Sequence, residues 1–218
     1  MTKLCIFDLD GTLINSLQDL AEAMNFALQN SGFPTHPTED YRQLVGSGVS
    51  VLADRAVGEC QPYTAAVKER ILSDFSDYYT VHCLDHTRPY PGIDRLLQQL
   101  RQNGILCAVN SNKPDAFTKA IVDRLFPSKP FAAIRGKVDG CERKPSPEGA
   151  LAIMKLADCT PGNTVYIGDS NVDGQTAANA GVRFYGVSWG FRSVQELLQS
   201  GAAAVAESPE ELLRCVIS

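Results

Sequence analysis

Two carboxylates, Asp8 and Asp10, are separated by one residue and directly follow the apolar run 4–7. A pair of this kind can divide the work between a nucleophile and a general acid or base. Gly11 allows the backbone to turn sharply behind them, and Thr12 offers a hydroxyl. An acidic turn with solvated side chains is the commoner structure for such a sequence on its own, so catalysis must be argued from further residues.

A second pair of acids, Asp169 and Asp173, follows another apolar stretch. If both stretches are parallel strands of one sheet, their carboxyl ends share an edge, and Asp8, Asp10 and Asp169 converge there. Converging acids repel one another unless a hard cation joins them, and an oxygen-rich site with few protein ligands suits Mg²⁺. We therefore predict a Mg²⁺ site. Asp173 is interpreted either as a further ligand or orienting residue, or as the N-cap of a helix that begins near Gly174.

Complementary polar groups follow two other apolar stretches. Ser111 can donate its hydroxyl to a phosphoryl oxygen, or it can cap the helix that follows. Lys144 can neutralise both a phosphate and a carboxylate, although a single loop lysine is usually solvated. Lys113 can assist in binding the phosphate, although an exposed lysine in the first turn of a helix is the commoner outcome. Only the combination of these groups is specific.

The elements that must position these residues are predicted from apolar runs that alternate with helical patterns. The expected strands cover residues 4–7, 105–109, 131–134, 164–167 and 183–187. Alternating strands and helices predict an α/β fold: a doubly wound parallel sheet, with helices on both faces.

Nearly a hundred residues separate the first two expected strands, far more than one crossover requires. Three apolar stripes with helical spacing lie in this gap, within residues 17–28, 49–57 and 67–79. We therefore predict a helical cap at residues 15–84, inserted into a catalytic core that comprises residues 1–14 and 85–218.

Composition limits the possible partners. The chain has 218 residues, 44% hydrophobic and 21% charged, and a formal net charge of −5 with no basic run, so a nucleic-acid partner is not expected. An anionic ligand must instead find a metal ion or a few placed cations. Seven cysteines without a CxxC pair, and the lack of an apolar signal or membrane-spanning run, predict a cytoplasmic protein without a membrane partner.

The order and spacing of the motifs resemble the haloacid dehalogenase superfamily of phosphotransferases. The matching segments are DLDGT at residues 8–12, Ser111, Lys144 and GDSNVD at residues 168–173. The resemblance spans the whole chain and implies a Rossmann-like core with a helical cap. The segments FDLDGTLINSLQDLAEAMN, YRQLVGSGVSVL, HCLDHTRPYPG and NSNKP are further similar to bacterial phosphoglycolate phosphatases. Ser111 stands where Thr is common, and KPSP replaces the frequent KPDP.

The resemblance implies that Asp8 attacks phosphorus to form an aspartyl-phosphate. Asp10 then protonates the leaving oxygen and activates the water that hydrolyses the intermediate. Asp8, the backbone carbonyl of Asp10 and Asp169 are the implied Mg²⁺ ligands, and Asp173 is a candidate fourth.

The resemblance also implies which groups bind the phosphoryl oxygens. Ser111 and Lys144 are expected to do so together with backbone amides near Leu9 and Asn112, and Thr12 is assigned to substrate binding.

Specificity is expected in the cap, because a closing lid can touch the leaving group. Arg42 and the loop Gly46, Ser47 and Gly48 are candidate ligands for the carboxylate of a small acid such as glycolate. The competing interpretation is a solvated helix residue and a loop that merely separates two helices. We expect His82 and His86 to lie in the linker between cap and core, and assign no role to Trp189 or Phe191.

The resemblance therefore implies a Mg²⁺-dependent phosphatase acting on a small phosphorylated metabolite, and its closer part implies 2-phosphoglycolate as the substrate; a monomer or homodimer is expected. A nucleotidase or pyrophosphatase shares the same motifs and stays an alternative. A dehalogenase is disfavoured by Asp10 and Asp169, and a sugar-phosphate mutase by Leu20, where those relatives carry His. A non-catalytic phospho-ligand-binding protein would be expected to lose Asp8 or Asp10.

Overall fold

The computed structural model describes residues 1–60 and 62–217. They form two compact units: unit 1 comprises Met1–Asn15 and Pro89–Ser218, and unit 2, the helical unit, comprises Ser16–Arg88. The chain passes from one to the other through β2 (Ile14–Asn15) and β3 (Arg88–Pro89), two short strands that pair with each other.

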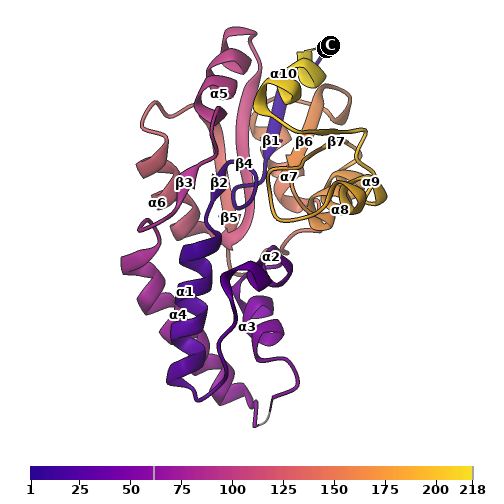
Figure 1. The fold of residues 1–218 in the computed structure, drawn as a ribbon. Coiled ribbons are helices and arrows are strands. Elements are labelled where there is room, and N and C mark those ends of the chain that lie inside the picture. The colour runs from indigo at the N-terminus through magenta and orange to yellow at the C-terminus, as the bar shows by residue number, and fades with distance from the viewer. Residues whose placement is uncertain (61, 218) are drawn as a thin grey trace. The chain divides into compact units, whose positions relative to one another are not determined.

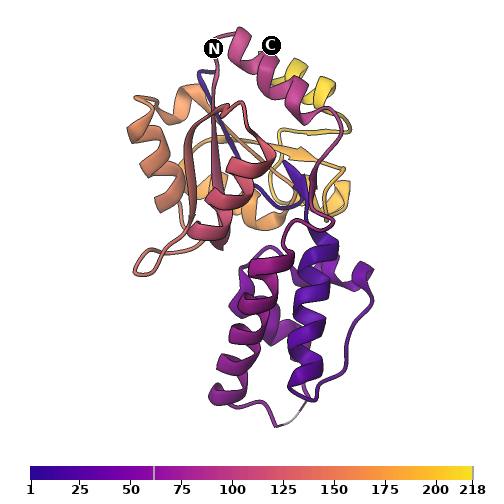
Figure 2. The same ribbon diagram turned by 90° about the vertical axis from the view of Figure 1, so that its left-hand side faces the viewer.

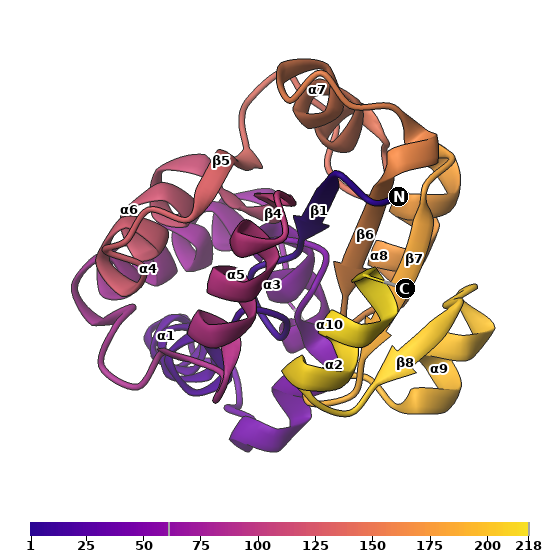
Figure 3. The same ribbon diagram turned by 90° about the horizontal axis from the view of Figure 1, so that it is seen from above.

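Unit 1 is built on a six-stranded sheet in the order β5-β4-β1-β6-β7-β8, with every neighbouring pair parallel. Figures 1 and 3 show the strands side by side. Their bounds are Leu4–Phe7 (β1), Leu106–Pro114 (β4), Phe131–Lys137 (β5), Thr164–Gly168 (β6), Arg183–Val187 (β7) and Ala204–Ala206 (β8). The strand order extends from β1 toward β5 and then resumes on the other side of β1, so β1 and β6 flank the point where the topology reverses.

Helices cover both faces of this sheet, with α7 and α8 on one side and α5 and α10 on the other (Figure 3). This arrangement follows from right-handed crossovers that run in opposite directions from β1. The helices are α5 (Ile93–Gln102), α6 (Asp115–Leu125), α7 (Glu148–Leu156), α8 (Asn171–Ala180), α9 (Val194–Gln199) and α10 (Pro209–Ile217).

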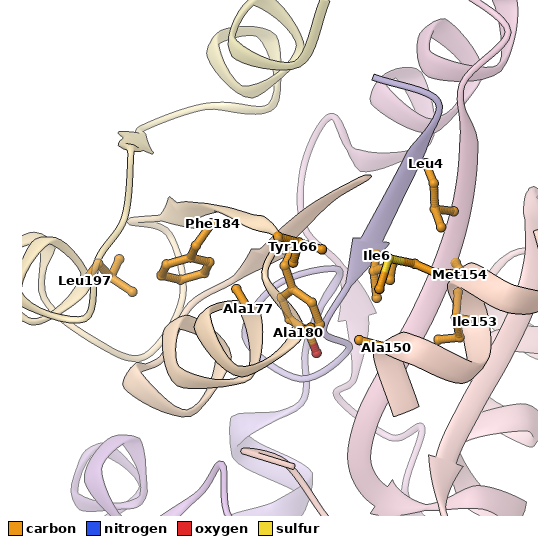
Figure 4. Packing of buried hydrophobic residues seen from close by; sticks show 12 residues of the cluster. Leu4, Ile6, Ala150, Ile153, Met154, Tyr166, Ala177, Ala180, Phe184 and Leu197 are labelled. Carbon is orange, nitrogen blue, oxygen red and sulfur yellow. The ribbon is translucent and has the colours of Figure 1, made fainter. Parts of the chain in front are cut away.

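A continuous apolar cluster fixes α7 and α8 against the sheet (Figure 4). Ile6 of β1 and Tyr166 of β6 are fully buried, and Ile153 and Met154 of α7 pack in the same cluster. Burying a side chain of this size contributes roughly 1.5–3 kcal/mol. The ends of β1 and β6 therefore stand on a rigid base.

Unit 2 consists of α1 (Leu17–Asn30), α2 (Tyr41–Leu44), α3 (Val49–Val57) and α4 (Ala65–His82), with a 3-10 turn at Thr38–Asp40. Helices α1 and α4 lie side by side (Figure 2). Met24 and Leu28 of α1 and Phe75 and Tyr79 of α4 are buried, which gives this unit a core of its own.

The five expected strands and the three expected apolar helices are confirmed, with differences at their ends. β4 continues past Val109 to Pro114, because its polar end still pairs with β5, and the short strand β8 was not predicted. His82 ends α4, so placing it in the linker was wrong. No helix in the described part of the chain is long and apolar enough to span a membrane.

Candidate active site

The reversal of strand order brings two sequence-distant acids together. Asp8 follows β1 and Asp169 follows β6, two neighbouring parallel strands in which Phe7 is in register with Ile167. The crevice beyond the carboxyl ends of strands at such a point is where open parallel sheets bind ligands.

Three carboxylates form a buried cluster at this edge. One oxygen each of Asp8, Asp169 and Asp173 lies within 4.8 Å of the others. All three residues are less than 10% exposed, Asp8 being 7%, Asp169 2% and Asp173 0% exposed. Carboxylate oxygens gathered in this way are the donor set that Mg²⁺ prefers, so the residues present fit the ion expected from the sequence.

The electrostatics of the cluster also favour a cation. Burial raises the pKa of Asp8 well above its usual range; Lys144 opposes this rise, while Asp173 and Asp169 add to it. Burial and the charge of Asp173 raise the pKa of Asp169 to about 7, against the lowering effect of the hydrogen bond from the Phe191 amide. Ionising these acids in the metal-free protein is therefore unfavourable in free energy, and a divalent cation bound between them would offset this penalty.

Lys144 is the cation that the protein itself supplies to the cluster. Its Nζ lies 2.9 Å from Asp8 Oδ1 and 2.8 Å from Asp173 Oδ1, and its side chain is 3% exposed. Burial works to lower the pKa of Lys144, but the charges of Asp173 and Asp8 outweigh it and raise that pKa well above its usual value. The ammonium group therefore stays charged.

The side chain of Asn112 holds the backbone of Lys144 on both sides. The Lys144 amide donates to Asn112 Oδ1 at 2.8 Å, and Asn112 Nδ2 donates to the Lys144 carbonyl at 3.1 Å. We predicted Asn112 as a phosphoryl-binding residue through its backbone; the structure shows in addition that its side chain positions Lys144.

Asp169 is fixed by groups from the β1 and β7 ends. Thr12 Oγ1 donates to Asp169 Oδ1 at 3.2 Å, and the Phe191 amide donates to Oδ2 at 2.8 Å. Trp189 Nε1 in turn donates to the Thr12 carbonyl at 3.0 Å. Sequence reasoning gave Trp189 and Phe191 no role, and it could not have found one for Phe191, because the donor is a backbone amide.

Gly11 and Gly190 allow the close approach that these bonds need. A Cβ on Gly11 would lie 2.3 Å from Asp169 Oδ2, and one on Gly190 would lie 2.4 Å from the Gly11 carbonyl oxygen. Gly11 also has a φ of 80°, which a residue with a Cβ rarely adopts.

Asp173 is held at the start of α8. Ser170 is the N-cap, its hydroxyl accepts from the Asp173 amide at 3.3 Å, and it donates to Asp173 Oδ2 at 2.6 Å. The alternative interpretation of Asp173 as the N-cap of a helix beginning near Gly174 was therefore wrong. Asp173 is the third residue of a capping box, which leaves its other oxygen, Oδ1, to Lys144.

The end of β4 corrects two further expectations. Ser111 lies on the strand and its Oγ accepts from the Lys113 amide at 3.2 Å, whereas α6 begins after Pro114 without a side-chain cap. Lys113 is neither exposed nor in the first turn of a helix: its side chain is 4% exposed, and its Nζ contacts both carboxylate oxygens of Asp10 at 2.9 Å.

The predicted specificity residues lie in the helical unit. Arg42 of α2 pairs with Glu39 at 2.8 Å, and its side chain is 43% exposed. Gly46, Ser47 and Gly48 connect α2 to α3, and Gly46 and Gly48 have φ values of 112° and 84°. Arg55 braces this loop by donating to the Leu44 carbonyl at 3.0 Å and to Ser47 Oγ at 3.3 Å.

Another acidic group in the helical unit has a structural explanation. Asp19, Glu22 and His86 also approach one another within 4.8 Å. Buried Asp19 accepts from the His86 amide at 2.9 Å, and from the amide and hydroxyl of Thr87 at 2.8 and 2.6 Å. Its carboxylate thus fastens the segment that leaves the helical unit to the start of α1.

Comparison with known proteins identifies the family. The sequence profile of haloacid dehalogenase-like hydrolases matches residues 5–187, a span that includes Asp8, Lys144, Asp169 and Asp173. This chain belongs to the haloacid dehalogenase-like hydrolase family. The resemblance stated from the sequence motifs is thereby confirmed, and so is the α/β core with its parallel sheet.

Members of this hydrolase family with similar sequences cover almost the whole chain. The phosphoglycolate phosphatase of Vibrio parahaemolyticus is 33% identical over an alignment of 220 positions that covers 98% of this chain and 96% of the relative. Phosphoglycolate phosphatase 1 of Pseudomonas aeruginosa is 30% identical over 217 residues, 99% of this chain and 80% of the relative. A crystal structure of a predicted phosphoglycolate phosphatase from Haemophilus somnus superposes with a TM-score of 0.91 at 28% identity, covering 98% and 97% of the two chains.

Proposed function

We propose that this protein hydrolyses 2-phosphoglycolate, with Mg²⁺ as cofactor and through a phosphorylated Asp8. The chain is a phosphoric monoester hydrolase of its family; the proposal concerns its substrate, its ion and its mechanism. The observation that carries it is the buried cluster of Asp8, Asp169 and Asp173, with Lys144 bound to it, at the reversal point of the sheet. The named phosphatase relatives, similar over almost the whole chain, support the substrate.

Asp8, Asp169 and the backbone carbonyl of Asp10 would hold the ion, with Asp173 as a further carboxylate beside it. Thr12 donates to one oxygen of Asp169 and the Phe191 amide to the other, and a carboxylate oxygen can accept more than one partner. When bound, Mg²⁺ would reduce the repulsion between the Asp8 carboxylate and an anionic phosphoryl group.

In the first step, an Asp8 carboxylate oxygen forms a bond to phosphorus while the ester oxygen leaves. Lys144 and the Leu9 amide, 2.9 and 2.7 Å from Asp8 Oδ1, hold this carboxylate in one orientation. Asp10 supplies the proton that the leaving oxygen needs. Lys144, which contacts Asp8, would neutralise the phosphoryl oxygens, and Ser111, on the neighbouring strand β4, would donate to them.

In the second step, water hydrolyses the aspartyl-phosphate. Asp10, now deprotonated, removes a proton from the attacking water, phosphate leaves, and the Asp8 carboxylate is regenerated. Atoms and charge balance over the cycle, since one water is consumed and one alcohol and one phosphate are released.

The helical unit is proposed as a cap that selects the leaving group. Arg42 and the backbone amides of Gly46, Ser47 and Gly48 are proposed ligands for the glycolate carboxylate, because a guanidinium and glycine-loop amides suit an anion. The partly exposed side chain of Arg42 supports this assignment. We also propose a cytoplasmic location, which is supported by seven cysteines that are all thiols.

Phosphate release from a panel of esters tests the substrate. The panel contains 2-phosphoglycolate, nucleoside monophosphates, pyrophosphate and hexose phosphates, each compared by kcat/KM with and without Mg²⁺. We expect 2-phosphoglycolate to be preferred. A preference of more than tenfold for nucleotides, about 1.4 kcal/mol of transition-state binding, would instead favour the nucleotidase alternative.

Replacing Asp8 by Asn tests the nucleophile. We expect kcat to fall at least about a thousandfold, roughly 4 kcal/mol, while the protein stays folded by circular dichroism. Acid-stable labelling by a radioactive phosphate ester should appear with the wild type and disappear with this variant. Asp94→Asn, which alters an exposed acid of α5, serves as the matched control and should keep wild-type kcat.

A further inference from the structure

Lys113 is a buried cation that the proposed mechanism does not use. Its Nζ lies 2.9 Å from both oxygens of Asp10, and the two side chains are 4% and 18% exposed. A lysine buried to this degree needs compensating partners, and the carboxylate of Asp10 is one of them.

The backbone of Lys113 is held firmly in place. The Thr118 hydroxyl, on a residue that is fully buried, donates to the Lys113 carbonyl at 3.1 Å. Gly136 of β5 packs so closely that a Cβ there would lie 2.7 Å from the same carbonyl oxygen. The ammonium group is therefore delivered to Asp10 from a rigid strand end.

Asn112 and Lys113, the two residues that follow Ser111, contact different residues. Asn112 fixes the backbone of Lys144, whereas Lys113 contacts the Asp10 carboxylate. The pairing of β4 with β5 is irregular between Asn110 and Pro114, and within this stretch the neighbouring side chains of Asn112 and Lys113 reach different partners.

The number of acids at this edge explains why a second lysine, Lys113, is placed beside Asp10. Four carboxylates meet at this edge, and Lys144 is already shared between Asp8 and Asp173. The Asp10 side chain is not part of the cluster that Asp8, Asp169 and Asp173 form. Without a bound cation beside it, a mobile carboxylate would be free to turn toward a metal in that cluster rather than toward the leaving oxygen.

We propose that Lys113 is a positioning residue that holds the Asp10 carboxylate outside the metal cluster and oriented for proton transfer. This inference rests on the proposed function, because it presupposes that Asp10 handles the proton. Lys113 acts through Asp10, so its removal should impair the chemical steps and leave substrate binding almost unchanged.

Steady-state kinetics of Lys113→Met test the catalytic consequence. With 2-phosphoglycolate, or with whichever ester of the panel is the best substrate, we expect kcat to fall at least about tenfold while KM changes less than about threefold. Lys119→Met, which removes a 55% exposed lysine from α6, is the matched control and should behave as the wild type. Wild-type kcat in Lys113→Met would overturn the proposal, and so would a large rise in KM at unchanged kcat, which would make Lys113 a substrate ligand.

A thermal unfolding cycle tests the Asp10 contact without any turnover. We expect Lys113→Met to lower Tm in the wild-type background and to lower it no longer in the Asp10→Asn background, because the partner has lost its charge. An equal drop in both backgrounds would show that Lys113 supports something other than Asp10 and would overturn the proposal. An inactive wild type would refute the proposed function instead, and the cycle would still report on the contact.

Discussion

Protons and Mg²⁺ should compete for the buried acids at the strand ends. The pKa of Asp169 is raised to about 7 by burial and by Asp173, and that of Asp8 is raised well above its usual range by burial. Both acids therefore hold protons in the metal-free protein at pH values where exposed carboxylates have lost them, and a bound cation must displace those protons.

We accordingly expect the Kd of Mg²⁺, measured by calorimetry, to rise with falling pH below about 7, by about tenfold per pH unit for each proton that the ion displaces, and so by up to about a hundredfold where both acids are protonated. The same raised pKa also makes the stability of the metal-free protein depend on pH. A raised folded-state pKa stabilises the metal-free fold below the unfolded value near 4, and this contribution is lost as the pH rises toward about 7. Tm without metal should fall over that window, and Asp169→Asn should flatten the fall. A Kd independent of pH between about 5.5 and 7.5 would contradict this expectation.

The turn at Gly11 offers a second test at the scale of single residues. Gly11→Ala would place a methyl group 2.3 Å from Asp169 Oδ2 at a φ of 80°. We expect Mg²⁺ binding to weaken at least about tenfold, because Asp169 must move, and stability to fall by about 1 kcal/mol from backbone strain. Gly32→Ala is the matched control: its φ is 79° and nothing lies within 4 Å of the added methyl group. Equal effects of both changes on Mg²⁺ binding would disprove the steric argument.

At the scale of elements, strand ends and helix starts do the positioning. β4 extends to Pro114 with an irregular register after Asn110, and this stretch places the Asn112 side chain on the backbone of Lys144 and the Lys113 ammonium group on Asp10. α8 begins with a capping box that fixes Asp173. The same residues thus complete secondary structure and orient the acids and lysines of the site.

The buried Asp19 carboxylate connects helix α1 to the segment at residues 86 and 87. The Asp19 carboxylate, 1% exposed, accepts from two backbone amides and from the Thr87 hydroxyl. Asp19→Asn replaces an acceptor by a donor and leaves buried N–H groups without a partner, so we expect a loss of about 2–3 kcal/mol in the free energy of unfolding by urea. Amide exchange at residues 86 and 87 should accelerate in parallel. Asp77→Asn, at an exposed position of α4, is the control and should change neither the free energy of unfolding nor the amide exchange. If the Asp19→Asn protein kept wild-type stability and slow exchange at these amides, Asp19 would not be what holds this segment.

At the scale of the whole molecule, the proposed mechanism divides the labour between two units. Unit 1 carries the groups for phosphoryl chemistry, and the helical unit is proposed to recognise the rest of the substrate. Changes in unit 1 should therefore affect every ester alike, whereas changes in the helical unit should discriminate between leaving groups.

Arg42→Met tests this division. We expect KM for 2-phosphoglycolate to rise about tenfold, because the substrate carboxylate loses a cation, while KM for p-nitrophenyl phosphate, which has no carboxylate, stays within about twofold. Arg70→Met removes a 62% exposed arginine from α4 and should leave both constants unchanged. A parallel rise of KM for both esters would show that Arg42 supports the protein rather than selecting the substrate.

The sequence by itself determined the parallel α/β core, the long helical insertion and the meeting of Asp8 with Asp169, because apolar periodicity and parallel strand ends are local patterns with one spatial outcome. Only the tertiary structure decided what Asn112, Lys113, Trp189 and the Phe191 amide contact. Their partners lie on other strands and helices, and neither spacing nor residue type records which of several nearby acids a buried lysine will reach. The start of α8 was misjudged for a related reason: serine and aspartate both cap helices, and which of Ser170 and Asp173 does so depends on where the backbone turns from extended to helical, which is at Ser170.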